Sequence, residues 1–316
     1  MEFKAYKMHG LGNNFLIIDR RNKPISLSKE KIIELGKRNN IGFDQLIFID
    51  EDRNSSAEVL VIPITIYNSD GNEINACGNG SRCIAYFICK EKKVDRLLIE
   101  TKERTLGAYL DVTNKHHVKI NMGKALFAQY DEIPLANDNL DPMKLKIDFL
   151  EKDYGVGFCV NVGNPHIIFF VNDCLKVDIK KIGPMVESHH YFPEKINVTF
   201  AEKLDEKGNI KVNVWERGAG KTKACGTAAC ATAVAAHITG IKGIQGEVSF
   251  GYEKMGTNLF IGKEQAKKIE RVIQKNVKIY NIHFEEGALK IENDVQRDEL
   301  WMTGPVSDIE EINIKI

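Results

Sequence analysis

Two cysteines lie in closely similar surroundings, far apart in the chain. Cys77 lies in INACGNGSRC (residues 74–83) and Cys225 in TKACGTAAC (residues 222–230), each between alanine and glycine. A Gly-rich stretch precedes both, and a helical pattern follows both. The start of a helix presents unpaired N–H groups and a positive dipole end, which stabilise a thiolate and lower the pKa of the thiol. We therefore expect these two cysteines to act as acid/base groups.

Two such groups on opposite walls of one cleft suit stereochemical inversion at a carbon that carries an acidic proton. One thiolate removes the proton from one face, and the opposed thiol donates a proton to the other face. The N–H groups after each cysteine would stabilise the carbanion by hydrogen bonding to a carboxylate. Neither sulfur needs to bond to the substrate.

The remaining five cysteines are expected to be buried and structural, because cysteine is among the most buried residue types. They are Cys83, Cys89, Cys159, Cys174 and Cys230. The odd total of seven cysteines and the absence of a CxxC pair argue against a disulfide framework and a structural zinc site.

The two cysteine segments belong to an internal repeat with an offset of 148 positions. Residues 61–67 and 210–215 are typical of strands, and both lead through a turn to the cysteine and its helix. The aligned pairs are Ile64 with Val212, Ile66 with Val214, Tyr67 with Trp215 and Ala85 with Ala233. The helix after Cys225 has no polar face, which predicts burial on all sides by surrounding sheet. A second matched pair, residues 9–19 and 160–171, runs from Gly-Asn into an apolar strand.

This repeat predicts an α+β fold of two pseudo-symmetric domains, each a mixed sheet or barrel around a central helix. We expect the domains at residues 1–135 and 136–316, with the chain end a candidate to pack back on the first half. A surface helix is expected at 26–40, capped by Ser28, with the apolar residues Ile32, Ile33 and Leu35 on one stripe. Residues 253–284 resemble an insertion, with a helix at 263–275 that would decorate the surface or contact a second subunit.

The bulk properties are those of a soluble protein. The 316 residues include 44 basic and 44 acidic ones, and 43% are hydrophobic. Nothing in this charge balance indicates binding of nucleic acid or of a membrane surface. The sequence contains neither a signal-peptide pattern nor an apolar run of about 18 residues, which predicts a cytoplasmic location.

The chain resembles the diaminopimelate epimerase family of cofactor-independent amino-acid epimerases. The motifs are MHGLGNNF, GFDQL, YNSDGNEINACGNGSRC, VNVGNPH, INVTF, WERGAGKTKACGTAACA and WMTGP, in the family's order. The resemblance implies an isomerase with the diaminopimelate epimerase-like fold, an active site between its domains, no cofactor and no metal. It implies conversion of LL-diaminopimelate to the meso form, for lysine and peptidoglycan precursors. A homodimer is a further expectation.

The resemblance also assigns site residues. Cys77 and Cys225 become the catalytic pair, assisted by His166 and Glu216. The implied substrate contacts are Asn13, Gln45, Asn68, Asn164, Asn197 and Arg217, with backbone groups of Gly78, Asn79, Gly226 and Thr227. The Arg217 guanidinium would suit the carboxylate at the far end of a substrate with two amino-acid ends. Judged without the family, His166 could equally be a structural histidine, and the asparagines could cap turns.

Other functions remain open from the sequence. A histidine racemase or a lanthionine epimerase would keep the two-thiol mechanism with another substrate. A thiol redox protein would cycle Cys77 and Cys225 through a disulfide, although no thioredoxin-like motif accompanies them. A non-catalytic binding protein for a small amino acid would tolerate serine at both cysteines. A pyridoxal phosphate racemase would need a Schiff-base lysine in a phosphate site, and the sequence offers none.

Overall fold

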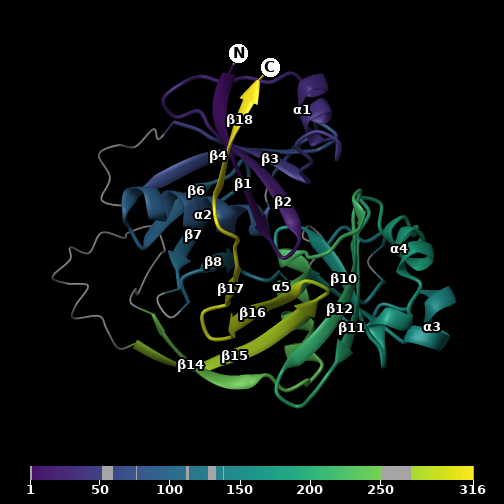
Figure 1. Cartoon of the computed structure of the whole chain (residues 1–316). Coiled ribbons are helices and arrows are strands. Elements are labelled where there is room, and N and C mark those ends of the chain that lie inside the picture. Colours follow the sequence, from purple (N-terminus) through teal and green to yellow (C-terminus); the bar gives the residue numbers. More distant parts are fainter. Residues whose placement is uncertain are drawn as a thin grey trace. The chain divides into compact units, whose positions relative to one another are not determined.

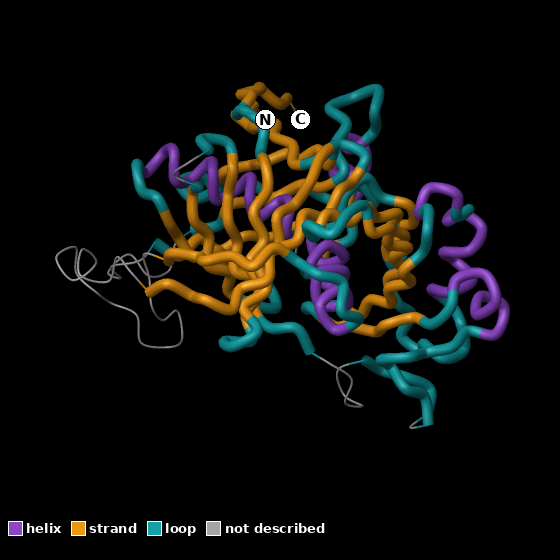
Figure 2. The backbone as a smooth tube through the Cα atoms, turned by 90° about the horizontal axis from the view of Figure 1, so that it is seen from below, coloured by secondary structure: helices purple, strands orange, loops and turns teal. Residues whose placement is uncertain are grey.

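The computed structural model describes residues 2–51, 60–75, 77–111, 114–126, 133–137, 139–250 and 272–315. Strands predominate over helices, and the fold is α+β (Figure 2). The chain divides into two compact units. Unit 1 consists mainly of the residues up to Asn121 and from Thr303, and unit 2 mainly of Met122–Ser249 and Ile273–Met302. The change of unit falls within β8 (His117–Gly123) and again within β17 (Glu299–Pro305).

Unit 1 is a mixed sheet around one central helix (Figure 1). Its elements are β1 Glu2–Gly10, β2 Asn13–Asp19, α1 Lys29–Gly36, β3 Gln45–Ile49, β4 Val61–Asn68, β5 Glu73–Ile74, α2 Gly78–Lys92, β6 Arg96–Glu100, β7 Thr105–Leu110 and β18 Glu310–Lys315. From β1 the strands pair in the order β1, β2, β3, β4, β6, β7, alternately antiparallel and parallel. Strand β18 pairs with β1, and β8 pairs with β7, both antiparallel.

Unit 2 repeats this topology, which confirms the pseudo-symmetry predicted from the sequence. Its elements are α3 Asp148–Tyr154, β9 Gly157–Asn161, β10 Pro165–Phe170, η1 Cys174–Lys176, α4 Ile179–Glu187, β11 Asn197–Lys203, β12 Asn209–Glu216, β13 Gly220–Lys221, α5 Gly226–Ile238, β14 Ile244–Phe250, β15 Val272–Phe284 and β16 Gly287–Asp294. The strands β9, β10, β11, β12, β15 and β16 pair with the same alternation. The offset of 148 maps β4 onto β12 from the first residue to the last.

Each central helix is surrounded by the strands of its own unit. Helix α2 contacts β1, β2, β3, β6 and β7, and α5 contacts β9, β10, β11 and β16. Only Thr227, His237 and Ile238 of α5 are not fully buried, because the helix consists almost entirely of small apolar residues. The prediction that this helix is buried on all sides is confirmed.

The apolar run of β2 is buried on both faces. Leu16 and Ile18 pack in one core cluster with residues of α1, while a Cβ at Gly80 of α2 would lie 3.4 Å from the Phe15 ring on the other face. Successive side chains of a strand point to opposite faces, so helices on both sides select a continuous apolar stretch.

Helix α1 begins at the predicted N-cap. The Ser28 Oγ accepts a hydrogen bond from the Lys31 N–H. Ile32 and Leu35 are buried, whereas Ile33 is 36% exposed, so Ile33 does not share the buried face of the other two residues. On a helix of eight residues packed through one narrow stripe, Ile33 lies one position, about 100°, from Ile32.

The segment expected to be an insertion is described only in part. Residues 253–271 lie outside the described residues, and Val272–Phe284 forms β15. The helix expected at 263–275 is therefore wrong over its last four residues. Strand β15 pairs with β12 in the same way that β6 pairs with β4, the equivalent of β12 in unit 1. The C-terminal part of β15 therefore belongs to the repeated sheet. None of the helices in the described ranges is long and apolar enough to cross a bilayer.

Candidate active site

Cys77 is the N-cap of α2. Its backbone is extended (φ −147°, ψ 109°), and its Sγ accepts a hydrogen bond from the Gly80 N–H at 3.3 Å. A Cβ at Gly80 would lie 2.7 Å from Cδ1 of buried Ile47, which explains why glycine occupies this position. Cys77 as a residue is partly exposed.

Cys225 occupies the equivalent position at the start of α5. Its Sγ accepts from the Ala228 N–H at 3.4 Å and lies 3.3 Å from the Thr227 Oγ1. The predicted placement of both cysteines at helix N-termini is confirmed. Cys225 differs from Cys77 in being buried, at 5% exposure.

The pKa of Cys225 departs from the sequence-based expectation. Burial raises it well above its ordinary value, and the negative charge of Glu216 raises it further. The N–H of Ala228 and the hydroxyl of Thr227 act in the opposite direction. A helix N-terminus can lower the pKa of a thiol, but the net pKa of Cys225 is raised, because the unfavourable transfer of a thiolate out of water outweighs the stabilisation by the helix end.

Glu216 influences Cys225 electrostatically. It lies at the end of β12, and the Thr222 hydroxyl donates a hydrogen bond to its Oε1. Burial raises the pKa of the Glu216 carboxyl, and the hydrogen bond from Thr222 partly offsets the rise. A carboxylate beside a thiol can accept its proton or hold the thiol in one orientation.

His166 is fully buried at the second residue of β10. Its Nε2 lies 2.9 Å from the Asn164 Oδ1 and 3.0 Å from the Thr227 Oγ1. Thr227 therefore links the imidazole to the Cys225 sulfur within unit 2. Burial, with a smaller contribution from Arg217, lowers the pKa of His166 to about 3. The ring is neutral at physiological pH, and its Nδ1 has no hydrogen-bond partner among the described residues.

Asn197 joins two loops of the site through its buried amide. Its Nδ2 donates to the Pro165 carbonyl at 2.8 Å, and its Oδ1 accepts from the Arg217 N–H at 2.9 Å. The exposed Arg217 side chain is held by a hydrogen bond from Nη1 to the Glu194 carbonyl at 2.9 Å. Asn197, expected as a substrate contact, is in this structure a link between backbone segments.

Glu187, the last residue of α4, is a part of this site that was not predicted from the sequence. Its carboxylate accepts from the Trp215 Nε1 at 2.7 Å and from the Gly218 N–H at 3.1 Å, on either side of Glu216 and Arg217. No motif marks this glutamate, since it lies 28 residues before Trp215. Only the packing of α4 against β12 and β13 reveals it.

In unit 1 the predicted polar contacts form two amide pairs. The Asn79 Nδ2 donates to the Asn13 Oδ1 at 3.0 Å, and the Gln45 Nε2 donates to the Asn68 Oδ1 at 3.2 Å. The fully buried Arg82, which the sequence analysis did not assign to the site, donates from Nη2 to the Asn79 Oδ1 at 2.9 Å.

The repeat explains why residues so distant in sequence gather in each unit. In unit 1, the first residues of β2 and β3 and the last residue of β4 lie at the same end of these neighbouring strands. They are Asn13, Gln45 and Asn68. In unit 2, β10 and β11 begin and β12 ends at the corresponding edge. Each central helix also begins shortly after that edge, at its cysteine. Two parallel strands that start there and one antiparallel strand that ends there thus place polar residues beside each helix N-terminus.

The other five cysteines are buried, as predicted. Burial raises the pKa of Cys83, Cys89 and Cys174 to about 12 and raises that of Cys159 as well. Such thiols stay protonated and unreactive at neutral pH.

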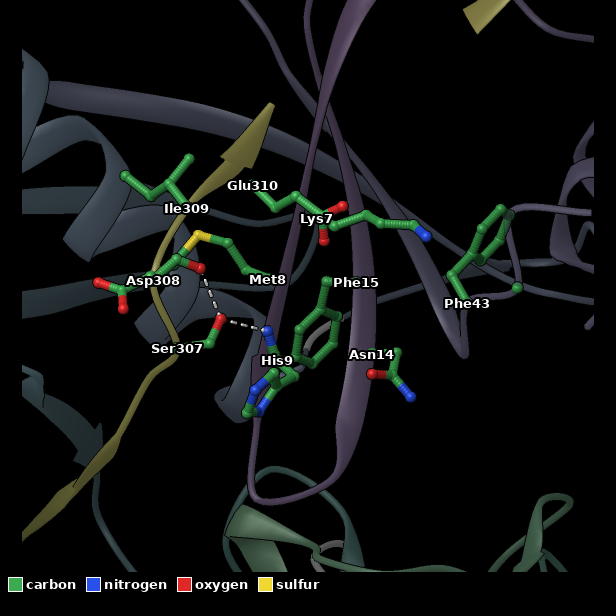
Figure 3. A pocket seen from close by; sticks show the side chains of 11 residues that line it. Lys7, Met8, His9, Asn14, Phe15, Phe43, Ser307, Asp308, Ile309 and Glu310 are labelled. Carbon is green, nitrogen blue, oxygen red and sulfur yellow. Dashed lines mark hydrogen bonds between the residues drawn. The ribbon is translucent and has the colours of Figure 1, made fainter. Parts of the chain in front are cut away.

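A cavity of about 440 Å³ opens in unit 1, apart from the groups described above (Figure 3). It is lined by Lys7, Met8, His9, Asn14, Phe15, Gly42, Phe43, Ser307, Asp308, Ile309 and Glu310. The His9 N–H donates to the Ser307 Oγ at 2.9 Å, which ties β1 to the segment before β18. The cavity contains neither Cys77 nor any predicted substrate contact of unit 1.

The sequence profile described as "Diaminopimelate epimerase" matches residues 5–128 and 158–259. A diaminopimelate epimerase of Pelagibacter ubique is 41% identical over the whole of both chains. The chain belongs to the diaminopimelate epimerase family. A second family member, from Sphingopyxis alaskensis, is 40% identical over 74% of this chain and 81% of its own.

Solved structures share the fold of this diaminopimelate epimerase family member at low sequence identity. A phenazine biosynthesis protein of the PhzF family from Bacillus anthracis matches with a TM-score of 0.61 and 15% identity, over all of both chains. A hydroxyproline epimerase from Agrobacterium vitis matches with a TM-score of 0.55 and 11% identity, over all of this chain and 93% of the other. At such identities the likeness concerns the fold alone.

Proposed function

We propose that the chain converts LL-diaminopimelate to meso-diaminopimelate without a cofactor, in the supply of lysine and peptidoglycan precursors. Family membership makes the chain an isomerase of this type. The observation that supports the mechanism occurs in both units. Helices α2 and α5 each begin at a cysteine whose sulfur accepts a hydrogen bond from a backbone N–H of the first turn. Residues serving only as apolar packing would not need this position twice.

In the proposed reaction one cysteine thiolate removes the α-proton and becomes a thiol, and the other thiol donates its proton to the opposite face and becomes a thiolate. The configuration inverts, and the total number of protons on the two sulfurs is unchanged. The raised pKa of Cys225 supports a resting state in which this residue is the protonated member. Each cysteine sulfur accepts a hydrogen bond from the N–H of the third helix residue, Gly80 in α2 and Ala228 in α5. We therefore assign the N–H groups of the first two residues of each helix to the substrate carboxylate.

Glu216 is proposed to assist Cys225, supported by the effect of its negative charge, which raises the pKa of the Cys225 thiol. His166 is proposed to assist Cys77. With Asn164 Oδ1 as acceptor, His166 carries its proton on Nε2, and its unprotonated Nδ1 has no hydrogen-bond partner among the described residues. The guanidinium of Arg217 would bind the distal carboxylate, while Asn13, Asn68 and the other predicted amides would hold the amino-acid ends.

Proton NMR in deuterated water tests the reaction and the substrate together. Purified protein without added cofactor is incubated with LL-diaminopimelate, and a parallel sample contains L-histidine. We expect deuterium at one α-carbon of diaminopimelate as the meso isomer appears, because the protonating thiol exchanges with solvent. Cys77→Ala and Cys225→Ala should each lose inversion and retain the circular dichroism spectrum of the folded protein.

The other outcomes separate the alternatives. Exchange in histidine alone would retain the two-thiol mechanism and refute the diaminopimelate assignment. Exchange in neither amino acid would refute the proposed reaction and return attention to a redox or binding role. A single cysteine variant with nearly full inversion would refute the two-base mechanism.

A cytoplasmic location and a homodimeric state are also proposed. Cys83, Cys89, Cys159, Cys174 and Cys225 are free thiols, which suits a reducing compartment. Light scattering after size exclusion would test the homodimer, which requires a mass near twice 35.7 kDa.

A further inference from the structure

The loop that contains Glu216 and Arg217 is held by hydrogen bonds to the carboxylate of Glu187. Glu187 Oε2 accepts from the Trp215 Nε1 at 2.7 Å, and Oε1 accepts from the Gly218 N–H at 3.1 Å. The two donors flank the pair, so one side chain sets both ends of the segment. At 7% exposure, the Glu187 carboxylate depends on these donors in place of water.

The surroundings of Glu187 are built around this contact. A Cβ at Gly183, one turn earlier in α4, would lie 2.5 Å from Cγ of Trp215, so the indole packs directly on the helix backbone. The Lys195 Nζ lies 3.5 Å from Glu187 Oε1 and supplies a positive charge from the other side. The segment between them, through Glu194, also holds the Arg217 guanidinium.

Local preference alone does not explain a glutamate at this position. The C-terminal end of a helix dipole is negative and disfavours a carboxylate, and α4 ends at Glu187. Glu187 is unfavourable for the end of its own helix, but it accepts hydrogen bonds from two donors of the neighbouring loop. These hydrogen bonds explain why a glutamate occupies the position.

We infer that Glu187 is a positioning residue of the active site: it fixes the Trp215–Gly218 loop so that Glu216 faces Cys225 and Arg217 faces the substrate. Glu187 acts through these neighbours and does not itself contact the reacting atoms. The expected change in KM rests on the proposed function. The expected change in Trp215 fluorescence rests on the hydrogen bonds alone.

The test uses the full chain with Trp301→Phe, so that Trp215 is the single indole. Glu187→Ala removes both acceptors, and Glu187→Gln retains one acceptor but turns an amide N–H₂ toward the other donor. We expect the Trp215 emission maximum to move to longer wavelength in Glu187→Ala, as water replaces the carboxylate. KM for LL-diaminopimelate should rise about tenfold or more, with an intermediate value for Glu187→Gln.

The matched control is Glu292→Gln, another buried carboxylate of unit 2, paired with Lys290 at 2.7 Å. It should lower Tm as a structural carboxylate does, without changing the Trp215 emission or KM. Unchanged emission and KM in Glu187→Ala would overturn the inference, and so would an equal rise of KM in Glu292→Gln. If the parent protein fails to epimerise diaminopimelate, the proposed function fails, and the emission of Trp215 still decides whether Glu187 holds the loop.

Discussion

At Cys225 two opposing effects act on one thiol. The helix N-terminus supplies an N–H from Ala228 that favours the thiolate, while burial and the Glu216 charge favour the thiol. Burial and the carboxylate prevail, which is why we propose a resting state with the proton on Cys225. His166 is governed by the same physics, since its burial removes the charged form of the imidazole.

Glu216→Gln tests this electrostatic coupling. The substitution removes the negative charge that raises the pKa of Cys225, so that pKa should fall. The alkaline limb of kcat against pH, where the thiol loses its proton, should move to lower pH. The rate should decrease about 10²-fold or more, as for other acid/base groups. An alkaline limb that stays in place would contradict the coupling of Glu216 to Cys225.

His166 should make stability depend on pH in the acid range. The unfolded histidine takes up a proton near pKa about 6.5, whereas the folded one stays neutral down to about 3. Its contribution is thus complete above the unfolded value and is lost as pH falls below it, by at most about 1.4 kcal/mol per pH unit. Urea unfolding between about pH 7 and about pH 4 should show a smaller loss in His166→Gln. The partly exposed His116→Gln is the control, and equal slopes for wild type and His166→Gln would contradict the prediction.

The central helices show how one topology accommodates different side chains. Helix α2 includes Tyr86, Phe87 and Ile88, whereas α5 has alanine at most of its buried positions. The strands around α5 therefore approach a helix with little side-chain volume. Such a helix has no room for larger residues, because interiors are close-packed.

Ala233→Leu tests the packing around α5. Ala233 has no exposed surface, so the added methylenes must displace neighbouring side chains. We expect the free energy of unfolding to fall by about 1–3 kcal/mol, measured in urea. Ile238→Leu, at a position 40% exposed on the same helix, should change stability by less than about 0.5 kcal/mol. Equal effects of the two substitutions would refute tight packing at Ala233.

For the molecule as a whole, the path of the chain makes unit 1 discontinuous. The chain leaves unit 1 within β8, forms unit 2, and returns within β17 to add β18 beside β1. Strands β1 and β18 lie side by side in Figure 1 and pair from Glu2–Lys315 to Lys7–Glu310. The edge of the unit 1 sheet is therefore completed by residues more than 300 positions from its first strand.

Ile314→Ala tests the contribution of this returning strand. Ile314 is 3% exposed and packs in the core cluster that contains Phe3 and Ile18. Its truncation should lower the free energy of unfolding by about 2 kcal/mol or more. Asn313→Ala, on the exposed side of the same strand, should cost less than about 0.5 kcal/mol. A small effect of Ile314→Ala would show that β18 contributes little to unit 1.

The sequence by itself determined the repeat, the α+β class, the family and the two cysteines at helix N-termini. These features depend on local patterns: alternation in strands, Gly-rich turns, and an apolar helix without a polar face. The Ser28 cap belongs to the same group, because an N-cap bond spans only three residues.

Only the tertiary structure decided the features that depend on distant neighbours. The burial of Cys225, the link from Thr227 to His166, the contact of Glu187 with the Trp215–Gly218 loop, and the pairing of β15 with β12 belong to this group. Each joins segments whose separation in sequence carries no pattern. Burial and hydrogen-bond partners set pKa values and loop positions, and both are properties of the packed chain, not of any local stretch.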